Sequence, residues 1–223
     1  MSEAERALTA PVEDYLKAVY ELEFSGEAAS TSDLASRLML SPASVSGMVR
    51  RLAQQGLLDH VPYKGVRLTA DGRRAALRTL RRHRVLESYL ATVLGVPWDR
   101  VHDEAEALEH AASDDLIDRM AAALGDPAFD PHGAPIPSRD GSVDETRHAT
   151  LLELPVGEDA TVMSVSDDDP AMLRYLAELE LRPGAAVRVT ARAPFDGPID
   201  VQVGDTVRAV GPTLARAVRV APA

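Results

Sequence analysis

The spacing of the apolar residues changes at a stretch rich in Pro and Gly, residues 125–141. Before this stretch, apolar residues recur at the three- and four-residue intervals of amphipathic helices, as in PVEDYLKAVYELEF, residues 11–24. From residue 149 they recur in short β-type runs separated by Gly or Pro, with one helical interruption, AMLRYLAELE. The chain is therefore predicted to be mainly α with a β domain at its C-terminal end.

Residues 31–56 carry the pattern of two short helices joined by a tight connection. Thr31 is the expected N-cap of the first helix, and Ser41 followed by Pro42 is expected to begin the second. The second helix is predicted to end at Gly56. This arrangement indicates a helix-turn-helix, a motif whose second helix enters the major groove of DNA.

A β-hairpin is predicted directly afterwards, with strands over residues 57–61 and 66–69. A hairpin in this position is a wing, so the fold expected here is a winged helix-turn-helix. The start of the second helix is expected to reach base edges, whereas its Arg residues and the wing are expected to contact phosphate. The predicted DNA-binding residues are Ser41, Ser44, Ser46, Arg50, Arg51, Lys64 and Arg67.

A long helix is predicted from Thr69 to about Leu94, followed by two helices with acidic outer faces. The final β-type runs predict a small barrel. The predicted domains are a winged helix over residues 1–72, a helical domain over 73–125, a linker over 126–148 and a β domain over 149–223.

Charge is distributed unevenly along a chain whose formal net charge is -11. Residues 31–85 contain eleven Lys and Arg against three Asp and Glu, whereas residues 95–169 contain four Arg against nineteen Asp and Glu. This asymmetry favours two partners selected by opposite charge, although solvated faces of different sign would also produce it.

The chain of 223 residues contains no Cys, which excludes disulfides and thiolate zinc sites. Its first twenty residues include acids and lack an apolar core, so no signal peptide is expected. No apolar run approaches the roughly 18 residues that a membrane span requires. We therefore expect a cytoplasmic protein without a membrane partner.

Two groups of His and acidic residues have the spacing of metal ligands. Four residues at intervals i, i+4, i+7 and i+8 lie near one face of a helix, namely His102, Glu106, Glu109 and His110. His83 and Glu87 form a further pair on the preceding helix. Imidazoles and carboxylates together suit divalent metals, and packing so many acids without a cation costs repulsion between like charges. The alternative is that these residues are solvated faces of acidic helices, where such pairs are common.

Several segments resemble the DtxR/MntR family of iron- and manganese-dependent repressors. They are EDYLKAVYELE, HRVLESYL, VHDEAEALEHAASDDLIDRM, the winged helix and GAPIPSRDG. The β domain resembles the SH3-like, FeoA-like domain of the longer members. The resemblance covers nearly the whole chain and implies a winged helix-turn-helix, a helical metal-binding and dimerisation domain, and an SH3-like β-barrel.

The resemblance also implies two metal sites. A primary, activating site would consist of Asp14, Glu106, Glu109 and His110. A second site would consist of His83, Glu87 and His102 with a β-domain carboxylate, for which Asp169 is the predicted ligand and Asp168 the alternative. The implied metal is Mn2+ or Fe2+, because Asp14 and Glu106 stand where the iron branch has sulfur ligands.

Two departures from the family pattern bear on these sites. Lys17 stands where the manganese branch has a carboxylate, which argues against the close two-metal arrangement of that branch. Met172 stands where the longer members have a polar ligand, and its thioether suits a hard ion poorly.

The expected function is metal-dependent transcriptional repression of metal-homeostasis genes. The protein is expected to bind a palindromic, double-stranded DNA operator as a homodimer. Neither enzymatic activity nor a small organic substrate is expected. One alternative is a winged-helix regulator that senses an organic ligand. Another is a di-iron carboxylate enzyme, whose Glu-x-x-His motifs are absent from the sequence. His60, His132 and His148 are expected to be surface or loop residues, and Trp98 is expected to serve packing.

Overall fold

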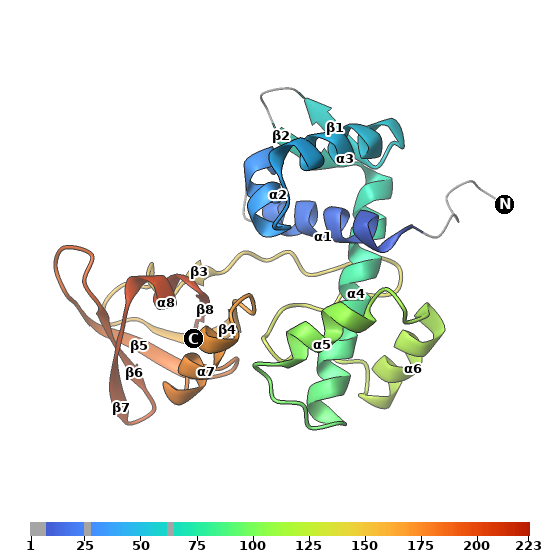
Figure 1. The fold of residues 1–223 in the computed structure, drawn as a ribbon. Helices are drawn as coiled ribbons and strands as arrows, with labels where there is room; N and C mark the ends of the chain where they lie inside the picture. Colours follow the sequence, from blue (N-terminus) through green and yellow to red (C-terminus); the bar gives the residue numbers. More distant parts are fainter. Residues whose placement is uncertain (1–7, 25–27, 62–64) are drawn as a thin grey trace. The chain divides into compact units, whose positions relative to one another are not determined.

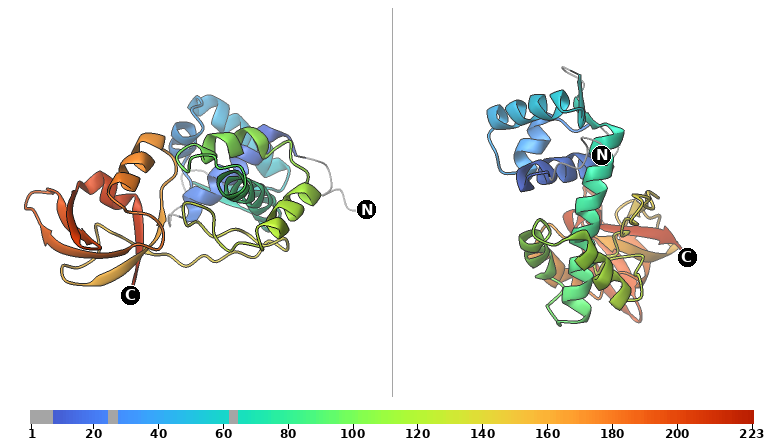
Figure 2. Two further views of the ribbon diagram at one scale, coloured as in Figure 1. Left: turned by 90° about the horizontal axis from the view of Figure 1, so that it is seen from below. Right: turned by 90° about the vertical axis from the view of Figure 1, so that its right-hand side faces the viewer.

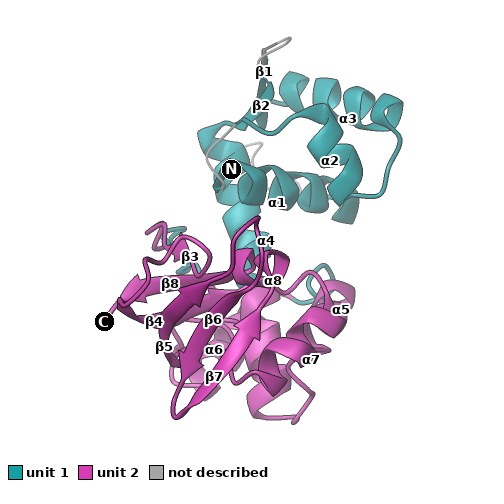
Figure 3. Ribbon diagram, turned by 90° about the vertical axis from the view of Figure 1, so that its left-hand side faces the viewer, with its two compact units in different colours: residues 1–82, 109–112, 137–143 teal, residues 83–108, 113–136, 144–223 magenta. Residues whose placement is uncertain are grey.

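The computed structural model describes residues 8–24, 28–61 and 65–223. The chain forms two compact units, coloured separately in Figure 3. The first unit consists of residues 1–82, 109–112 and 137–143, and the second of residues 83–108, 113–136 and 144–223. Because these units are defined by contacts between residues, they do not test the four domains predicted from the sequence, and those domains stay a prediction. Among the described residues, no helix combines the length and the apolarity needed to cross a membrane.

The first unit is a winged helix-turn-helix, as predicted. Its elements are α1 (Ala10–Phe24), α2 (Thr31–Arg37), α3 (Pro42–Gln54), β1 (Leu58–Val61), β2 (Gly65–Leu68) and the first half of α4 (Ala70–Thr92) (Figure 1). The two strands pair antiparallel from Leu58 opposite Leu68 to Val61 opposite Gly65. Apolar residues of all three helices and of the hairpin, including Leu16, Leu34 and Leu52, form one buried core.

Side-chain caps begin the helices of this unit. Ser41 Oγ accepts a hydrogen bond from the backbone N–H of Ser44, with Pro42 in the first turn, as predicted. Thr69 Oγ1 likewise accepts from the N–H of Gly72 at the start of α4. The prediction for α2 was wrong by one residue, because Ser30 accepts the N–H of Asp33 and Thr31 is the first helical residue.

The second unit joins a helical part to a sheet. The helical part contains the second half of α4, α5 (Val101–Leu108) and α6 (Asp114–Ala123). The sheet has the order β3-β8-β4-β5-β6-β7, and Figure 2 shows its curvature from two sides. Its elements are β3 (Ala149–Thr150), β4 (Asp159–Val165), α7 (Pro170–Glu178), β5 (Ala186–Arg192), β6 (Ile199–Val203), β7 (Thr206–Val210), α8 (Pro212–Arg216) and β8 (Val218–Pro222).

This sheet confirms the predicted β domain and differs from it in two places. Residues 151–154 form turns rather than continuing a strand. The short helix α8 precedes β8, because Pro212 fits the first turn of a helix and interrupts the β-type run. Alternate residues of β6 are buried in the core, namely Ile199, Val201 and Val203, as expected for a sheet with one covered face.

Candidate metal centres

Three potential ligands from distant parts of the sequence meet in the first unit. We name Asp14, Glu109 and His110 the first cluster, whose ligand atoms all lie within 4.8 Å of one another. Asp14 lies on α1, and the other two residues form the turn that follows α5. His110 Nε2 lies 2.7 Å from Asp14 Oδ1 and 3.5 Å from Glu109 Oε1. The structure therefore brings together three of the four residues predicted for the primary site.

Glu13 orients the imidazole of His110. Its Oε2 accepts a hydrogen bond of 2.7 Å from His110 Nδ1, and its Oε1 accepts one of 3.2 Å from Arg82. With Nδ1 bound to Glu13, Nε2 faces Asp14 Oδ1, a buried atom without a hydrogen-bond partner in the part of the chain that the structure describes. A His that donates its second nitrogen to a carboxylate is the usual form of a metal-ligating His. The donor set thus fits a divalent cation.

Electrostatics in the first cluster also favour a cation. Burial raises the pKa of Asp14, and the positive charges of His110 and Lys17 oppose this change. Burial alone would lower the pKa of His110, but its hydrogen bond to Glu13 and the neighbouring carboxylates raise it. The carboxylates of the first cluster therefore favour positive charge at the position of His110.

Lys17 supplies positive charge beside the same carboxylates. Its ammonium donates a hydrogen bond of 2.7 Å to Glu109 Oε1, and the side chains of Lys17 and Glu109 are 9% and 0% exposed. The residue that departs from the family pattern thus pairs with a predicted ligand inside the cluster. A cation that binds Glu109 must share this carboxylate with the ammonium or displace it.

Four ligands meet in the second unit. We name His83, Glu87, His102 and Asp167 the second cluster, whose ligand atoms also lie within 4.8 Å of one another. Glu87 Oε1 lies 3.0 Å from His83 Nε2 and 3.3 Å from His102 Nδ1. His102 Nδ1 lies 3.5 Å from Asp167 Oδ2 and 3.2 Å from His83 Nε2. Two imidazole nitrogens that face each other between carboxylates are placed to bind a shared cation.

In the second cluster, the interactions between imidazoles and carboxylates outweigh the effect of burial on the pKa values. Burial alone would raise the pKa of Glu87, yet its interactions with the imidazoles of His102, His132 and His83 hold it well below its usual value. Burial alone would lower the pKa of His102, but its hydrogen bonds to Asp167 and Glu87 raise it to about 11. His102 is therefore protonated in the metal-free protein at neutral pH.

The structure places Asp167, and not the predicted ligand Asp169, in the second cluster. Asp169 is exposed and caps α7, since its Oδ1 accepts the N–H groups of Ala171 and Met172. A carboxylate used as an N-cap at the surface is directed to its own helix rather than to the cluster. Asp167, two residues earlier, faces the imidazoles instead.

Glu106 lies beside the outer nitrogens of the second cluster. Its Oε1 is 3.7 Å from His83 Nδ1 and 3.8 Å from His102 Nε2. The carboxylate thus faces the ring nitrogens that point away from Glu87. Its predicted role as a primary-site ligand stays a prediction.

Asp130 and His132 are two further potential metal ligands, and the sequence did not predict them. His132 is wholly buried, contrary to the expectation of a surface residue. Its Nε2 donates to the carbonyl of Trp98 at 2.8 Å, and its Nδ1 lies 3.7 Å from Glu87 Oε1. Asp130 Oδ1 accepts the N–H groups of His132 and Ala134, which folds this part of the linker into a tight turn. A His in a Pro- and Gly-rich stretch has no periodic pattern, so spacing could not reveal it.

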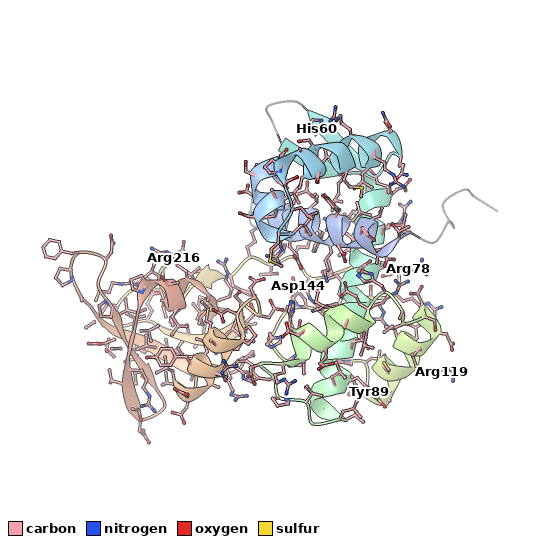
Figure 4. The ribbon with its side chains drawn as sticks, viewed as in Figure 1. His60, Arg78, Tyr89, Arg119, Asp144 and Arg216 are labelled. Atoms are coloured by element: carbon pink, nitrogen blue, oxygen red, sulfur yellow. The ribbon has the colours of Figure 1, made fainter. Side chains whose placement is uncertain are left out.

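The predicted DNA-binding residues lie on α3 and the wing. Ser41, Ser44, Arg50 and Arg51 are exposed, whereas Ser46 is half-buried and donates to the carbonyl of Pro42. Arg67 is exposed on β2 opposite Asp59, and Figure 4 labels the neighbouring wing residue His60. Lys64 lies outside the described residues.

The chain matches three known domain families along its length. Residues 7–66 match the N-terminal DNA binding domain of the iron dependent repressors, residues 69–138 match their metal binding and dimerisation domain, and residues 149–222 match the FeoA domain. The iron-dependent repressor IdeR of Mycobacterium leprae is 33% identical over 189 residues, which cover 79% of this chain and 82% of IdeR. The chain belongs to the iron-dependent repressor family.

Other members of this family agree with the fold described above. The diphtheria toxin repressor of Corynebacterium efficiens is 35% identical over 158 residues, which cover 69% of each chain. The solved structure of a manganese-dependent transcriptional repressor in complex with manganese is 43% identical with a TM-score of 0.90, covering 95% of this chain and 100% of that one. The structure of ScaR with bound Zn2+ is 29% identical with a TM-score of 0.83, covering 95% of this chain and 99% of that one. The resemblance, the fold class and metal-dependent repression as the family's function are thereby confirmed.

Proposed function

We propose that this protein senses Mn2+ or Fe2+ and, when metal is bound, represses metal-homeostasis genes in the cytoplasm by binding palindromic operators. The observation that carries this proposal is the first cluster. It joins Asp14, on the first helix of the DNA-binding fold, to Glu109 and His110, in the turn between α5 and α6.

The first cluster gives metal a way to control DNA binding. A bound divalent cation supplies the positive charge that draws the three ligands together. Asp14 then fixes α1 to the turn after α5, while Glu13 and Arg82 hold His110 in position. A ligand that binds the DNA-competent arrangement more tightly than others shifts the population toward it. Glu106 is proposed as a further ligand because the family resemblance implies it.

The ligand chemistry supports Mn2+ at least as well as Fe2+. The first cluster offers two carboxylates and one imidazole, and oxygen donors suit Mn2+. The solved relative described above binds manganese, whereas IdeR is named for iron. Affinity rises from Mn2+ to Fe2+ along the divalent series, so geometry must provide any discrimination.

The second cluster supports a structural use of metal within the second unit. Its imidazoles come from α4 and α5, and Asp167 comes from the segment between β4 and α7. Metal bound there would fasten the sheet to the helices. Arg174, which pairs with Asp99, and Arg182, which lies over the Trp98 ring, already join the same parts.

A second copy of the chain is the proposed partner of the helical part. Large apolar side chains of this part are exposed, namely Val93, Leu94, Leu108, Leu116 and Phe129. Apolar surface of this kind commonly marks an interface between proteins. A dimer would present two copies of α3, as binding to a palindromic operator requires.

Selection from random DNA duplexes with Mn2+ would give an operator probe for the test. We expect the affinity for this probe to fall steeply when a chelator replaces Mn2+ or Fe2+, the latter measured anaerobically. Equal affinity with metal and with chelator would contradict the proposal. Calorimetry without heat of Mn2+ binding would also contradict it, and would favour a regulator that senses an organic ligand.

A further inference from the structure

Glu87 belongs to two groups of potential ligands at once. One group is the second cluster, and the other consists of Glu87, Asp130 and His132. In each group the ligand atoms lie within 4.8 Å of one another. A carboxylate has two oxygens, and here they have different surroundings.

One oxygen of Glu87 is satisfied and the other is not. Oε1 lies within 3.3 Å of both His83 Nε2 and His102 Nδ1. Oε2 has no hydrogen-bond partner within the described ranges, and the whole Glu87 side chain is 0% exposed. A buried, ionised oxygen without a donor is costly, so its position calls for a positive group.

Two more unsatisfied atoms belong to the second group. His132 donates through Nε2 to Trp98, so Nδ1 is the nitrogen left for a metal; this atom is buried without a hydrogen-bond partner among the described residues. Asp130 Oδ2 is also buried without a hydrogen-bond partner among them, and Arg84 Nε approaches it only to 3.5 Å. Each of the three residues of this group, from α4 and from the linker turn, thus carries a buried acceptor, and His132 Nδ1 lies 3.7 Å from Glu87 Oε1, an arrangement that suits a metal ion.

Charge allows two cations in this region. Four carboxylates lie in or beside the two groups, namely Glu87, Asp130, Asp167 and Glu106. With neutral imidazoles these four charges equal those of two divalent ions, and three remain if Glu106 binds metal in the first cluster. Arg84 adds one positive charge beside Asp130. Asp167 Oδ2 lies 3.5 Å from His102 Nδ1 and 4.0 Å from His132 Nδ1, so it reaches both groups.

We propose that the second unit holds a pair of divalent cations that share the Glu87 carboxylate, one with His83 and His102 and the other with Asp130 and His132. Paired metal sites in proteins place their ions about 3.5–4 Å apart, a separation that one carboxylate spans. The inference rests on the proposed function only in taking Mn2+ as the metal. The first cluster and its control of DNA binding are independent of it.

Electron paramagnetic resonance of the full-length protein loaded with Mn2+ tests the pair directly. Two Mn2+ ions that share a carboxylate couple magnetically, whereas isolated Mn2+ gives a six-line signal. We expect the wild type to show the coupled signal beside the six-line signal of Mn2+ in the first cluster, and His132→Gln and Asp130→Asn to show the six-line signal alone. Each of these variants should lose one bound Mn2+ per chain, and Glu87→Gln should lose two.

Asp169→Asn and His148→Gln are the matched controls, since they change an acid and a His near the same segments outside both groups. Both should keep the coupled signal and the wild-type Mn2+ content. A wild type that shows only uncoupled Mn2+ at saturation would overturn the pair without any variant. His132→Gln and Asp130→Asn with unchanged Mn2+ content would do the same. In either case, DNA binding that still requires Mn2+ would leave the proposed function standing.

Discussion

Replacing Lys17 by Met should destabilise the metal-free protein and increase its stabilisation by metal. The substitution removes the ammonium that donates to Glu109 and leaves a carboxylate that is 0% exposed. Breaking a buried ion pair from one side costs about 3–5 kcal/mol. In a chain of this size each kcal/mol changes the melting temperature by about 2–4 °C, so a decrease of roughly 6–20 °C is expected.

Thermal unfolding measured by circular dichroism, first with chelator and then with saturating Mn2+, provides the assay. Mn2+ should restore much of the loss, because a cation bound to Glu109 replaces the missing charge. A double variant that also carries Glu109→Gln should recover most of the stability without metal, since the buried side chain at position 109 is then uncharged. Arg119→Met is the control, because it removes a cation from an exposed pair with Asp115 and should leave the melting temperature unchanged.

Two results would refute this reasoning. One is a metal-free Lys17→Met protein that melts at the wild-type temperature. The other is a double variant that melts as low as Lys17→Met alone, because the loss would then come from packing of the Lys17 stem rather than from the unpaired charge.

Three further predictions concern protons, ligands and DNA. Although burial alone would lower both values, the neighbouring carboxylates raise the pKa of His102 to about 11 and that of His132 to about 9. Mn2+ must therefore displace protons and should bind more tightly as pH rises from about 6 to about 8. Calorimetry in buffers of different ionisation enthalpy counts the protons, and a count of zero contradicts the assignment. Asp167→Ala should lower the Mn2+ content. Asp169→Ala should keep the Mn2+ content and lose about 1 kcal/mol of stability, because it removes the N-cap of α7. Equal metal loss in both variants would contradict the placement of Asp167, rather than Asp169, in the second cluster. Arg51→Ala should weaken binding to all DNA sequences alike and reduce the salt slope by about one; a change of preference at a single base pair would instead assign Arg51 to base recognition.

The fold was predictable from the sequence because its elements follow local rules. Helical spacing, the caps Ser41 and Thr69, and the hairpin pattern placed the winged helix to within a few residues. The errors came from local competition between residues. Ser30 and Thr31 are both good caps, and only the backbone shows that Ser30 is used.

The candidate sites were predictable only where their ligands share a helix. His83 and Glu87, one turn apart on α4, stand out by spacing. Asp130 and His132 do not, because a linker without regular structure positions them through its hydrogen bonds. The choice of Asp167 over Asp169 depends on where α7 begins, which three successive Asp residues do not reveal.

The central claim is that metal held by Asp14, Glu109 and His110 controls DNA binding, and one comparison tests it most directly. The affinity of wild type and Asp14→Ala for an operator duplex is measured by fluorescence anisotropy at increasing free Mn2+, with Asp169→Ala as the control. We predict that Mn2+ strengthens binding of wild type and of the control, whereas Asp14→Ala stays at the weak affinity of the chelated wild type. If Asp14→Ala responds to Mn2+ as the wild type does, the first cluster does not control DNA binding.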